Sequence, residues 1–98
     1  MKTLKEKFVK NELPYTLLER NDKVALYGVG GTYTKEFTHY EVCEIHIRDD
    51  QYGLREALPS NEQFGIDKSR AINGYNDALK YYAELSHALN KKENSLSM

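Results

Sequence analysis

The chain has little of several residue types, and each shortage excludes a class of protein. It contains one cysteine, Cys43, so no disulfide can form within the chain. No stretch approaches the roughly 20 apolar residues of a transmembrane helix. The first residues, MKTLKEKFVKNELP, alternate charged and apolar side chains and lack the apolar run of a signal peptide. We therefore expect a cytoplasmic protein that does not act in a membrane.

A large excess of charge of one sign is also lacking. The 14 Lys and Arg residues nearly balance the 15 Asp and Glu residues, which gives a formal net charge of −1. A protein that is drawn to nucleic acid by its overall charge carries a clear basic excess. Nucleic acid is therefore not the favoured partner. It remains an alternative, because basic residues gathered in one segment can bind it locally.

What the chain does contain is typical of one globular domain. Its 98 residues, 40% hydrophobic and 30% charged, are enough for a core without a metal or a disulfide. It has eight tyrosines and no tryptophan. Tyrosine is enriched at binding surfaces, and it is also common in half-buried strands. We expect a single domain over residues 1–93 and a disordered tail over residues 94–98.

The N-terminal segment predicts a short helix over residues 3–12. Thr3 and Glu6 have the spacing of a capping box, and Leu4 and Phe8 fall on one side of such a helix. The lysines here form a loose basic cluster, which is either a solvated helix face or an arm that contacts phosphate. They are Lys2, Lys5, Lys7 and Lys10.

A β-hairpin is predicted next. Apolar runs over residues 15–20 and 23–29 flank Asn21-Asp22, which suits a two-residue turn and sets Leu17 opposite Leu26. The following GVGG lacks the spacing of a phosphate-binding loop. We expect a connection between strands whose tip, with Tyr33 and Lys35, is a contact loop.

The remaining elements are a strand over residues 37–48 and a long amphipathic helix over residues 67–91. Strand alternation places Cys43, Ile45 and Ile47 on the face that meets the helix. Glu44, His46 and Arg48 then lie on the other face. The predicted fold is α+β: a three-stranded antiparallel β-meander packed on a long C-terminal α-helix, with a short N-terminal helix (α-β-β-β-α).

The stretch THYEVCEIHIRDD, residues 38–50, is rich in metal-ligand residue types. Alternation places His39 and Cys43 on one face and His46 on the other, so a regular strand does not gather them. Cysteine-based zinc sites use two or more cysteines. We therefore expect no metal, no cofactor and no enzyme activity. A site built from His46, Asp49 and Asp50, or a Glu44–His46 acid–base pair, is a second alternative.

The sheet face away from the helix is the candidate binding surface. We expect it to be open, with an apolar and aromatic centre and a charged edge, which suits a protein partner or a second copy. The main hypothesis is a non-enzymatic protein-interaction module. The alternative is nucleic-acid binding through sheet tyrosines and N-terminal lysines. The candidate binding residues on this face and its loop are Tyr27, Tyr33, Lys35, Tyr40, Glu44, His46 and Arg48.

One part of the chain resembles other proteins. Tyr40-Glu41-Val42, the segment REALPSNEQFG at residues 55–65 and the amphipathic helix after it resemble small uncharacterised proteins of phages and bacterial mobile elements. The resemblance covers residues 40–90. It implies a cytoplasmic accessory protein that binds a host factor, and it carries over no catalytic residue and no cofactor.

Overall fold

The structure is a computed structural model that describes residues 2–31, 37–51, 53–60, 62, 64 and 66–96. Across these residues the chain is α+β and ends in a helix. The elements in chain order are β1 (Lys7–Lys10), β2 (Leu13–Arg20), β3 (Val24–Val29), β4 (His39–Glu44), β5 (His46–Asp50), β6 (Gly53–Ala57), β7 (Arg70–Ile72) and α1 (Tyr75–Leu96).

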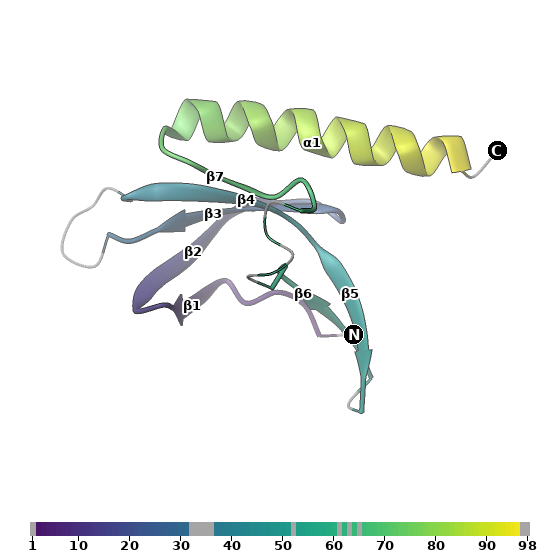
Figure 1. Cartoon of the computed structure of the whole chain (residues 1–98), viewed down its shortest axis with the longest axis horizontal. Helices are drawn as coiled ribbons and strands as arrows, with labels where there is room; N and C mark the ends of the chain where they lie inside the picture. The colour runs from purple at the N-terminus through teal and green to yellow at the C-terminus, as the bar shows by residue number, and fades with distance from the viewer. Residues whose placement is uncertain are drawn as a thin grey trace.

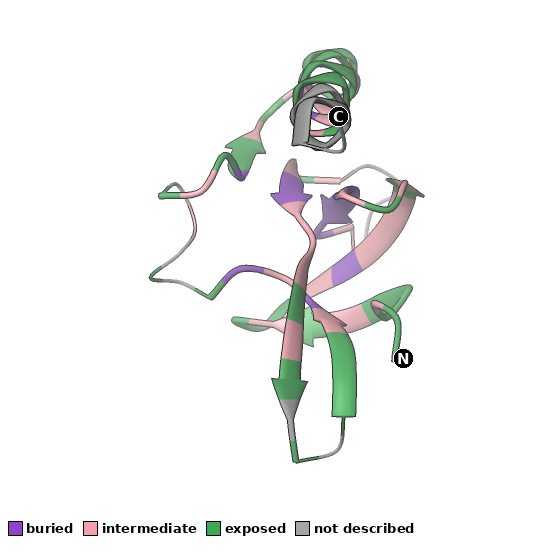
Figure 2. Cartoon of the chain, turned by 90° about the vertical axis from the view of Figure 1, so that its right-hand side faces the viewer, coloured by how far each residue is buried: buried purple, intermediate pink, exposed green. Residues whose placement is uncertain are grey.

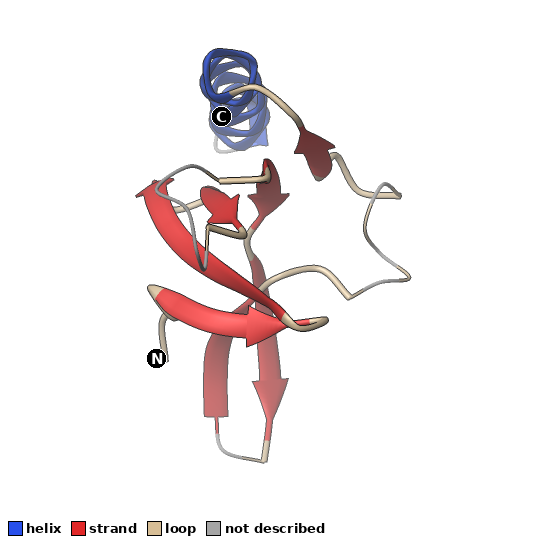
Figure 3. Cartoon of the chain, turned by 90° about the vertical axis from the view of Figure 1, so that its left-hand side faces the viewer, coloured by secondary structure: helices blue, strands red, loops and turns tan. Residues whose placement is uncertain are grey.

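The main sheet has five antiparallel strands in the order β1-β2-β3-β4-β7. Helix α1 packs along one side of it, over β3, β4 and β7 (Figure 1). Strands β5 and β6 form a separate two-stranded sheet, β6 also makes an isolated parallel bridge from Arg55 to Lys2, and this hairpin points away from the helix (Figure 3). The prediction of a three-stranded meander with an N-terminal helix is therefore wrong.

The segment predicted as the N-terminal helix instead contains β1. Phe8 lies opposite Tyr15 across the β1–β2 pair, and the two rings stack with centroids 4.8 Å apart. Asn11 and Glu12, with φ angles of 54° and 66°, form the two-residue turn that joins these strands. A contact between the aromatic residues of two strands stabilises the hairpin, and a helix over residues 3–12 would not make it.

The register of β2 against β3 also differs from the prediction. Leu17 lies opposite Tyr27 rather than Leu26. Part of the reason is a longer turn, in which Asn21 Oδ1 accepts hydrogen bonds from the backbone N–H groups two and three residues later, at 2.8 and 2.9 Å. Such an Asn-centred turn holds more residues than the predicted two-residue turn.

A β-bulge between Leu17 and Glu19 shifts the register once more. An extra residue in one strand reverses which face each later side chain occupies. Arg20 consequently lies opposite Ala25, on the face that also carries Tyr27. This is the sheet face away from α1, and it is where the Arg20 side chain finds its partner.

The sheet buries both of its faces, and β3 is buried along its whole length, as a central strand should be. The helix-side cluster contains Val24, Leu26, Val42, Ala78 and Leu85. The opposite cluster contains Tyr15, Ala25, Tyr27 and Val29, with Leu4, Phe8, Leu17, Ile45 and Leu58 packed against it. The face predicted to be open is therefore covered, and Tyr27 is 0% exposed.

The predicted long strand is two strands that belong to different sheets. Its alternation places Val42 toward the helix and Cys43, which lies opposite Ala25, away from it. This reverses the predicted facing of Cys43. At Ile45 the backbone N–H donates to the carbonyl oxygen of Lys23, at 2.8 Å, and β5 then leaves the main sheet.

The C-terminal helix is present, with different limits from those predicted. It begins at Tyr75, because Ala71 and Ile72 belong to β7 and pair with Glu41 and Tyr40 of β4. It continues through Leu96, into the segment expected to be a tail.

Candidate functional site: a basic pocket

A pocket of about 410 Å³ lies on the sheet face away from the helix. It is bounded by the N-terminal segment, β1, the β5–β6 hairpin and the segment that follows β6. Its lining residues are Lys2, Thr3, Leu4, Lys5, Phe8, Lys10, Tyr27, Arg48, Arg55, Glu56, Ala57, Leu58, Pro59 and Ser60. Its volume falls within the roughly 300–1,000 Å³ of small-molecule sites.

The lining carries far more positive than negative charge. Among the described residues, five cationic residues and one acidic residue, Glu56, border the pocket. The whole chain has a net charge of −1, so this balance is local and not a property of the whole surface. The cationic residues are Lys2, Lys5, Lys10, Arg48 and Arg55.

Glu56 is already neutralised by a partner inside the protein. Its two carboxylate oxygens accept hydrogen bonds from both terminal nitrogens of Arg20, at 2.6 and 2.8 Å. The Leu4 backbone N–H also donates to Oε1, at 3.1 Å. The Arg20 hydrogen bond lowers the pKa of Glu56, so the carboxylate is charged at neutral pH and fully paired. The pocket therefore keeps its positive character.

The N-terminal segment is held against the hairpin by main-chain hydrogen bonds. The Lys2 N–H donates to the Leu54 carbonyl at 3.3 Å, and the Glu56 N–H donates to the Lys2 carbonyl at 2.8 Å. The Tyr27 hydroxyl donates to the Lys5 carbonyl at 2.8 Å. Two of the lysines that line the pocket are thus fixed through their backbone, and their side chains remain exposed.

Arg48 and Arg55 lie directly opposite each other in the β5–β6 hairpin. Like charges at opposed positions of an antiparallel pair repel each other. Each arginine also interacts with another group of the protein. Figure 2 shows that the hairpin is mostly exposed or half-buried, in contrast to the buried central strands. The charged pair is therefore close to solvent and to the pocket.

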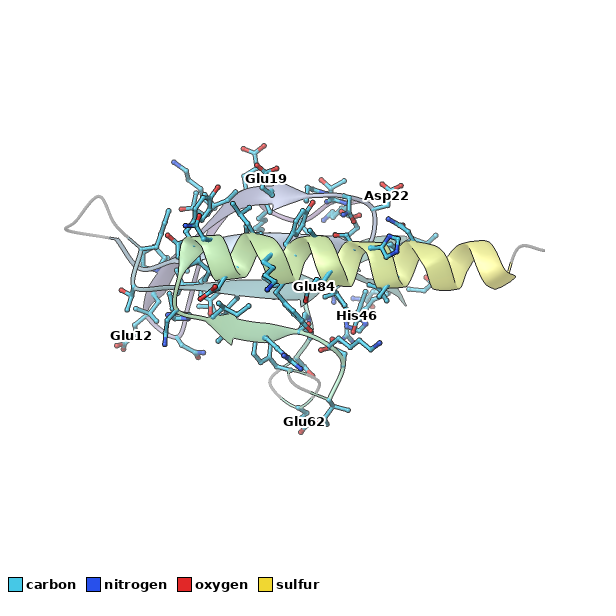
Figure 4. All side chains as sticks on the ribbon, turned by 90° about the horizontal axis from the view of Figure 1, so that it is seen from above. Glu12, Glu19, Asp22, His46, Glu62 and Glu84 are labelled. Carbon is cyan, nitrogen blue, oxygen red and sulfur yellow. The ribbon has the colours of Figure 1, made fainter. Side chains whose placement is uncertain are left out.

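Two of the predicted binding residues are engaged by the segment at residues 67–69. His46 Nε2 lies 2.8 Å from Asp67 Oδ2. Glu44 accepts a hydrogen bond from the Lys68 backbone N–H at 2.8 Å, and the Glu44 N–H donates to the Ser69 hydroxyl at 2.9 Å. Figure 4 shows His46 on the side of α1 that faces away from Asp22 and the turn before β3. Both side chains anchor this segment.

The other predicted binding residues are dispersed. Arg48 and Tyr27 line the basic pocket, although Tyr27 is fully buried at its base. Tyr40 is half-buried beside the start of α1, with its ring centroid 5.4 Å from that of Tyr75. Tyr33 and Lys35 lie outside the described residues. The five predicted residues that lie within the described ranges therefore do not form one surface.

A separate polar cluster joins Tyr15, Glu41 and His39. The Tyr15 hydroxyl donates to Glu41 Oε2 at 2.6 Å, and His39 Nε2 lies 3.3 Å from the same oxygen. Burial raises the pKa of Tyr15, which keeps the phenol protonated. These three residues do not line the basic pocket. The cluster is best explained as a hydrogen-bonded buried tyrosine.

Cys43 has the environment of a structural cysteine. It is 2% exposed, and burial raises the pKa of its thiol. A reactive cysteine needs access and a stabilised thiolate. The described residues contain no group of three or more His, Cys, Asp or Glu side chains placed to hold a metal ion. No helix in the described ranges has the length and apolar character required to cross a membrane.

The sequence contained a partial signal for the pocket. The lysine cluster of the N-terminal segment was visible, with phosphate contact as one interpretation. Arg55 and Leu58 gave no such signal, because they meet the lysines only through the fold. Comparison with known proteins returns no match to a family model, a curated protein or a solved structure. The resemblance to phage and mobile-element proteins stays a prediction.

Proposed function

We propose that this chain is a non-enzymatic binding protein that takes a phosphate-bearing ligand at its basic pocket. The observation that carries the proposal is the set of five cationic residues around a pocket of about 410 Å³ whose acidic residue is already paired. Such a pocket attracts an anion, because five of its lining residues are cationic and its acidic residue is Glu56.

Phosphate suits this lining better than a single carboxylate does. The planar guanidinium group of arginine matches phosphate oxygens in pairs, and lysine adds mobile positive charge. The pocket has two arginines and three lysines for this purpose. This supports the lysine part of the nucleic-acid alternative. It does not support the tyrosine part, because Tyr27 is buried and Tyr40, which packs beside Tyr75 of α1, does not line the pocket.

A charge-reversal comparison tests the proposal. Isothermal titration calorimetry at low salt would measure the affinity of inorganic pyrophosphate for the wild type, for Lys5→Glu and for Lys80→Glu. Lys5 lines the pocket, and Lys80 is an exposed residue of α1, which packs on the other face of the sheet. Both variants change the net charge equally, so only the position of the charge differs.

We expect Lys5→Glu to weaken pyrophosphate binding about tenfold, since one attractive contact of order 1 kcal/mol becomes repulsive. Lys80→Glu should bind nearly as the wild type does. Equal weakening by both variants would show a general charge effect rather than a site, and no binding by the wild type would remove the proposal.

A protein-interaction role is a second candidate function, and one observation favours it. Ile47 and Leu54 are 53% and 51% exposed, and the hairpin register places them on the same face. Two adjacent exposed apolar side chains on a projecting hairpin suit contact with a second copy of the chain. Ile66, at 84% exposed, is an apolar residue elsewhere on the surface and serves as a control.

The test is light scattering after size exclusion over a range of concentrations. Self-association through the hairpin predicts a mass that rises with concentration in the wild type and in Ile66→Ser. The Ile47→Ser/Leu54→Ser variant should stay monomeric. A wild type that is monomeric at every concentration would rule out this second function.

A further inference from the structure

The residues that line the basic pocket differ in burial. Lys2, Lys5 and Arg55 are exposed, whereas Leu58 is half-buried and Pro59 is buried. Three cationic residues therefore border the opening, Lys10 and Arg48 lie half-buried, and Leu58 and Pro59 contribute apolar surface below the opening. A ligand that fills such a pocket has an anionic part near the opening and an apolar or aromatic body beneath it.

The charge of the lining suits an anion with more than one negative charge. Arg48 and Arg55 lie opposite each other, and three lysines border the same pocket. A phosphate monoester carries about −1.5 to −2 at neutral pH, whereas a carboxylate carries one charge. A dianion is attracted to each cationic group of the lining more strongly than a single charge is.

An aromatic ring at the base is held in a fixed position. Phe8 lines the pocket and is half-buried. Its ring stacks on Tyr15 at 4.8 Å and meets the Tyr27 ring edge-on at 5.3 Å. Because two neighbours fix its orientation, Phe8 can contact a planar ligand without losing side-chain freedom. Bases stack on aromatic side chains with little dependence on sequence.

We infer that the ligand of the pocket is a nucleoside phosphate whose phosphate binds among Arg48, Arg55 and the lysines and whose base lies against Phe8 and Leu58. This inference rests on the proposed function. The pocket volume of about 410 Å³ suits one nucleotide rather than a duplex. The same chemistry is offered by a free nucleotide and by the phosphorylated end of a nucleic-acid strand.

The experiment compares the parts of the ligand by calorimetry at one low salt concentration. The probes are AMP, adenosine and inorganic phosphate. A second pair, a trinucleotide with a 5′-phosphate and the same trinucleotide with a 5′-hydroxyl, distinguishes a strand end from a free nucleotide. We expect AMP to bind at least about tenfold more tightly than either adenosine or inorganic phosphate, because both parts contribute.

Two variants separate the base contact from the phosphate contact. Phe8→Leu should weaken AMP binding about five- to tenfold through the loss of stacking, and should leave inorganic phosphate binding unchanged. Arg55→Gln should weaken both. Val9→Ala, at a neighbouring residue that is 71% exposed and does not line the pocket, should change neither affinity. Thermal melting of each variant shows that it is folded.

The outcomes distinguish this inference from the function on which it rests. If AMP binds no more tightly than inorganic phosphate, or if Phe8→Leu weakens both equally, the nucleoside part is wrong and phosphate binding stands. If none of the phosphate compounds binds, both fail. Tighter binding of the 5′-phosphorylated trinucleotide than of AMP assigns the strand end as the source, and the reverse assigns the free nucleotide.

Discussion

At the scale of single residues, the turn between β1 and β2 holds Glu12 at a positive φ angle, which glutamate rarely adopts. Asn11 and Glu12 have positive φ angles, 54° and 66°. Asparagine tolerates this left-handed region, but for other L-residues with a Cβ it costs about 1–2 kcal/mol. The type of turn requires positive φ at both central residues, and Asn-Gly is its preferred pair.

Glu12→Gly should therefore stabilise the protein. We expect the free energy of unfolding to rise by about 1 kcal/mol, because glycine adopts positive φ without a steric penalty. Urea unfolding followed by circular dichroism measures the change. Glu12→Ala removes the same carboxylate and keeps a Cβ, so it should give little or no gain. If Glu12→Ala raised the free energy of unfolding as much as Glu12→Gly does, the effect would come from the lost charge rather than from the backbone conformation.

Glu56 gives a residue-scale prediction about pH. The Arg20 hydrogen bond lowers the pKa of Glu56 below its ordinary 4.5 in the folded state. The stabilisation that the Arg20–Glu56 ion pair gives the folded state is therefore fully present above pH 4.5. It is lost as the pH falls through the lower pKa that Glu56 has in the folded state. Wild-type stability should decline over this acidic range.

The measurement is urea unfolding between pH 2 and pH 7 for the wild type, Glu56→Gln and Arg20→Gln. Both variants should be less stable than the wild type at pH 7, and the difference should narrow toward low pH, because the ion pair is absent in all three once Glu56 is protonated. A difference that is constant with pH would contradict the assignment of this pair.

At the scale of elements, Asn21 connects the turn before β3 to the helix. Its Oδ1 accepts the two backbone N–H groups that define the turn. Its Nδ2 donates to Ser86 Oγ at 2.8 Å and lies 3.3 Å from the Tyr82 hydroxyl. One half-buried side chain therefore fixes a β-turn and the position of α1 above the sheet.

Asn21→Ala should cost about 1–3 kcal/mol of stability, since it leaves partly buried backbone N–H groups without an acceptor. Asn21→Asp should cost less, because a carboxylate keeps the acceptor and the two hydroxyl groups can rotate to donate to it. Chemical denaturation of both variants gives the comparison, with Asp22→Ala at the exposed neighbouring position as a control. Equal losses of stability in Asn21→Ala and Asn21→Asp would contradict this account of the turn.

The local sequence pattern predicts some elements correctly. It fails where contacts between residues far apart in the sequence determine which element forms. The helix was predicted because apolar residues such as Ala78 and Leu85 recur at helical spacing and meet the sheet. Its start was misplaced because Ile72 also fits helical spacing, yet pairs with Tyr40 in the sheet. The spacing of Leu4 and Phe8 favoured a helix, and stacking of Phe8 on Tyr15 favours a strand.

At the scale of the whole molecule, the basic pocket combines segments that are far apart in the chain. Lys2 and Lys5 come from the N-terminal segment, and Arg55 and Leu58 lie some 50 residues later. No local spacing rule relates them. The sequence indicated basic residues in the first segment, but their meeting with the β5–β6 hairpin depends on the position of the hairpin in the fold, which local pattern does not determine.

The central claim is that this pocket, and not the rest of the surface, binds phosphate. The most direct measurement is a titration of the ¹⁵N-labelled protein with inorganic phosphate at constant ionic strength, followed by two-dimensional NMR. We predict saturable shifts of backbone amides over residues 2–10 and 48–60, and none along the exposed side of α1. Shifts spread evenly over the molecule, or confined to the helix, would contradict the account.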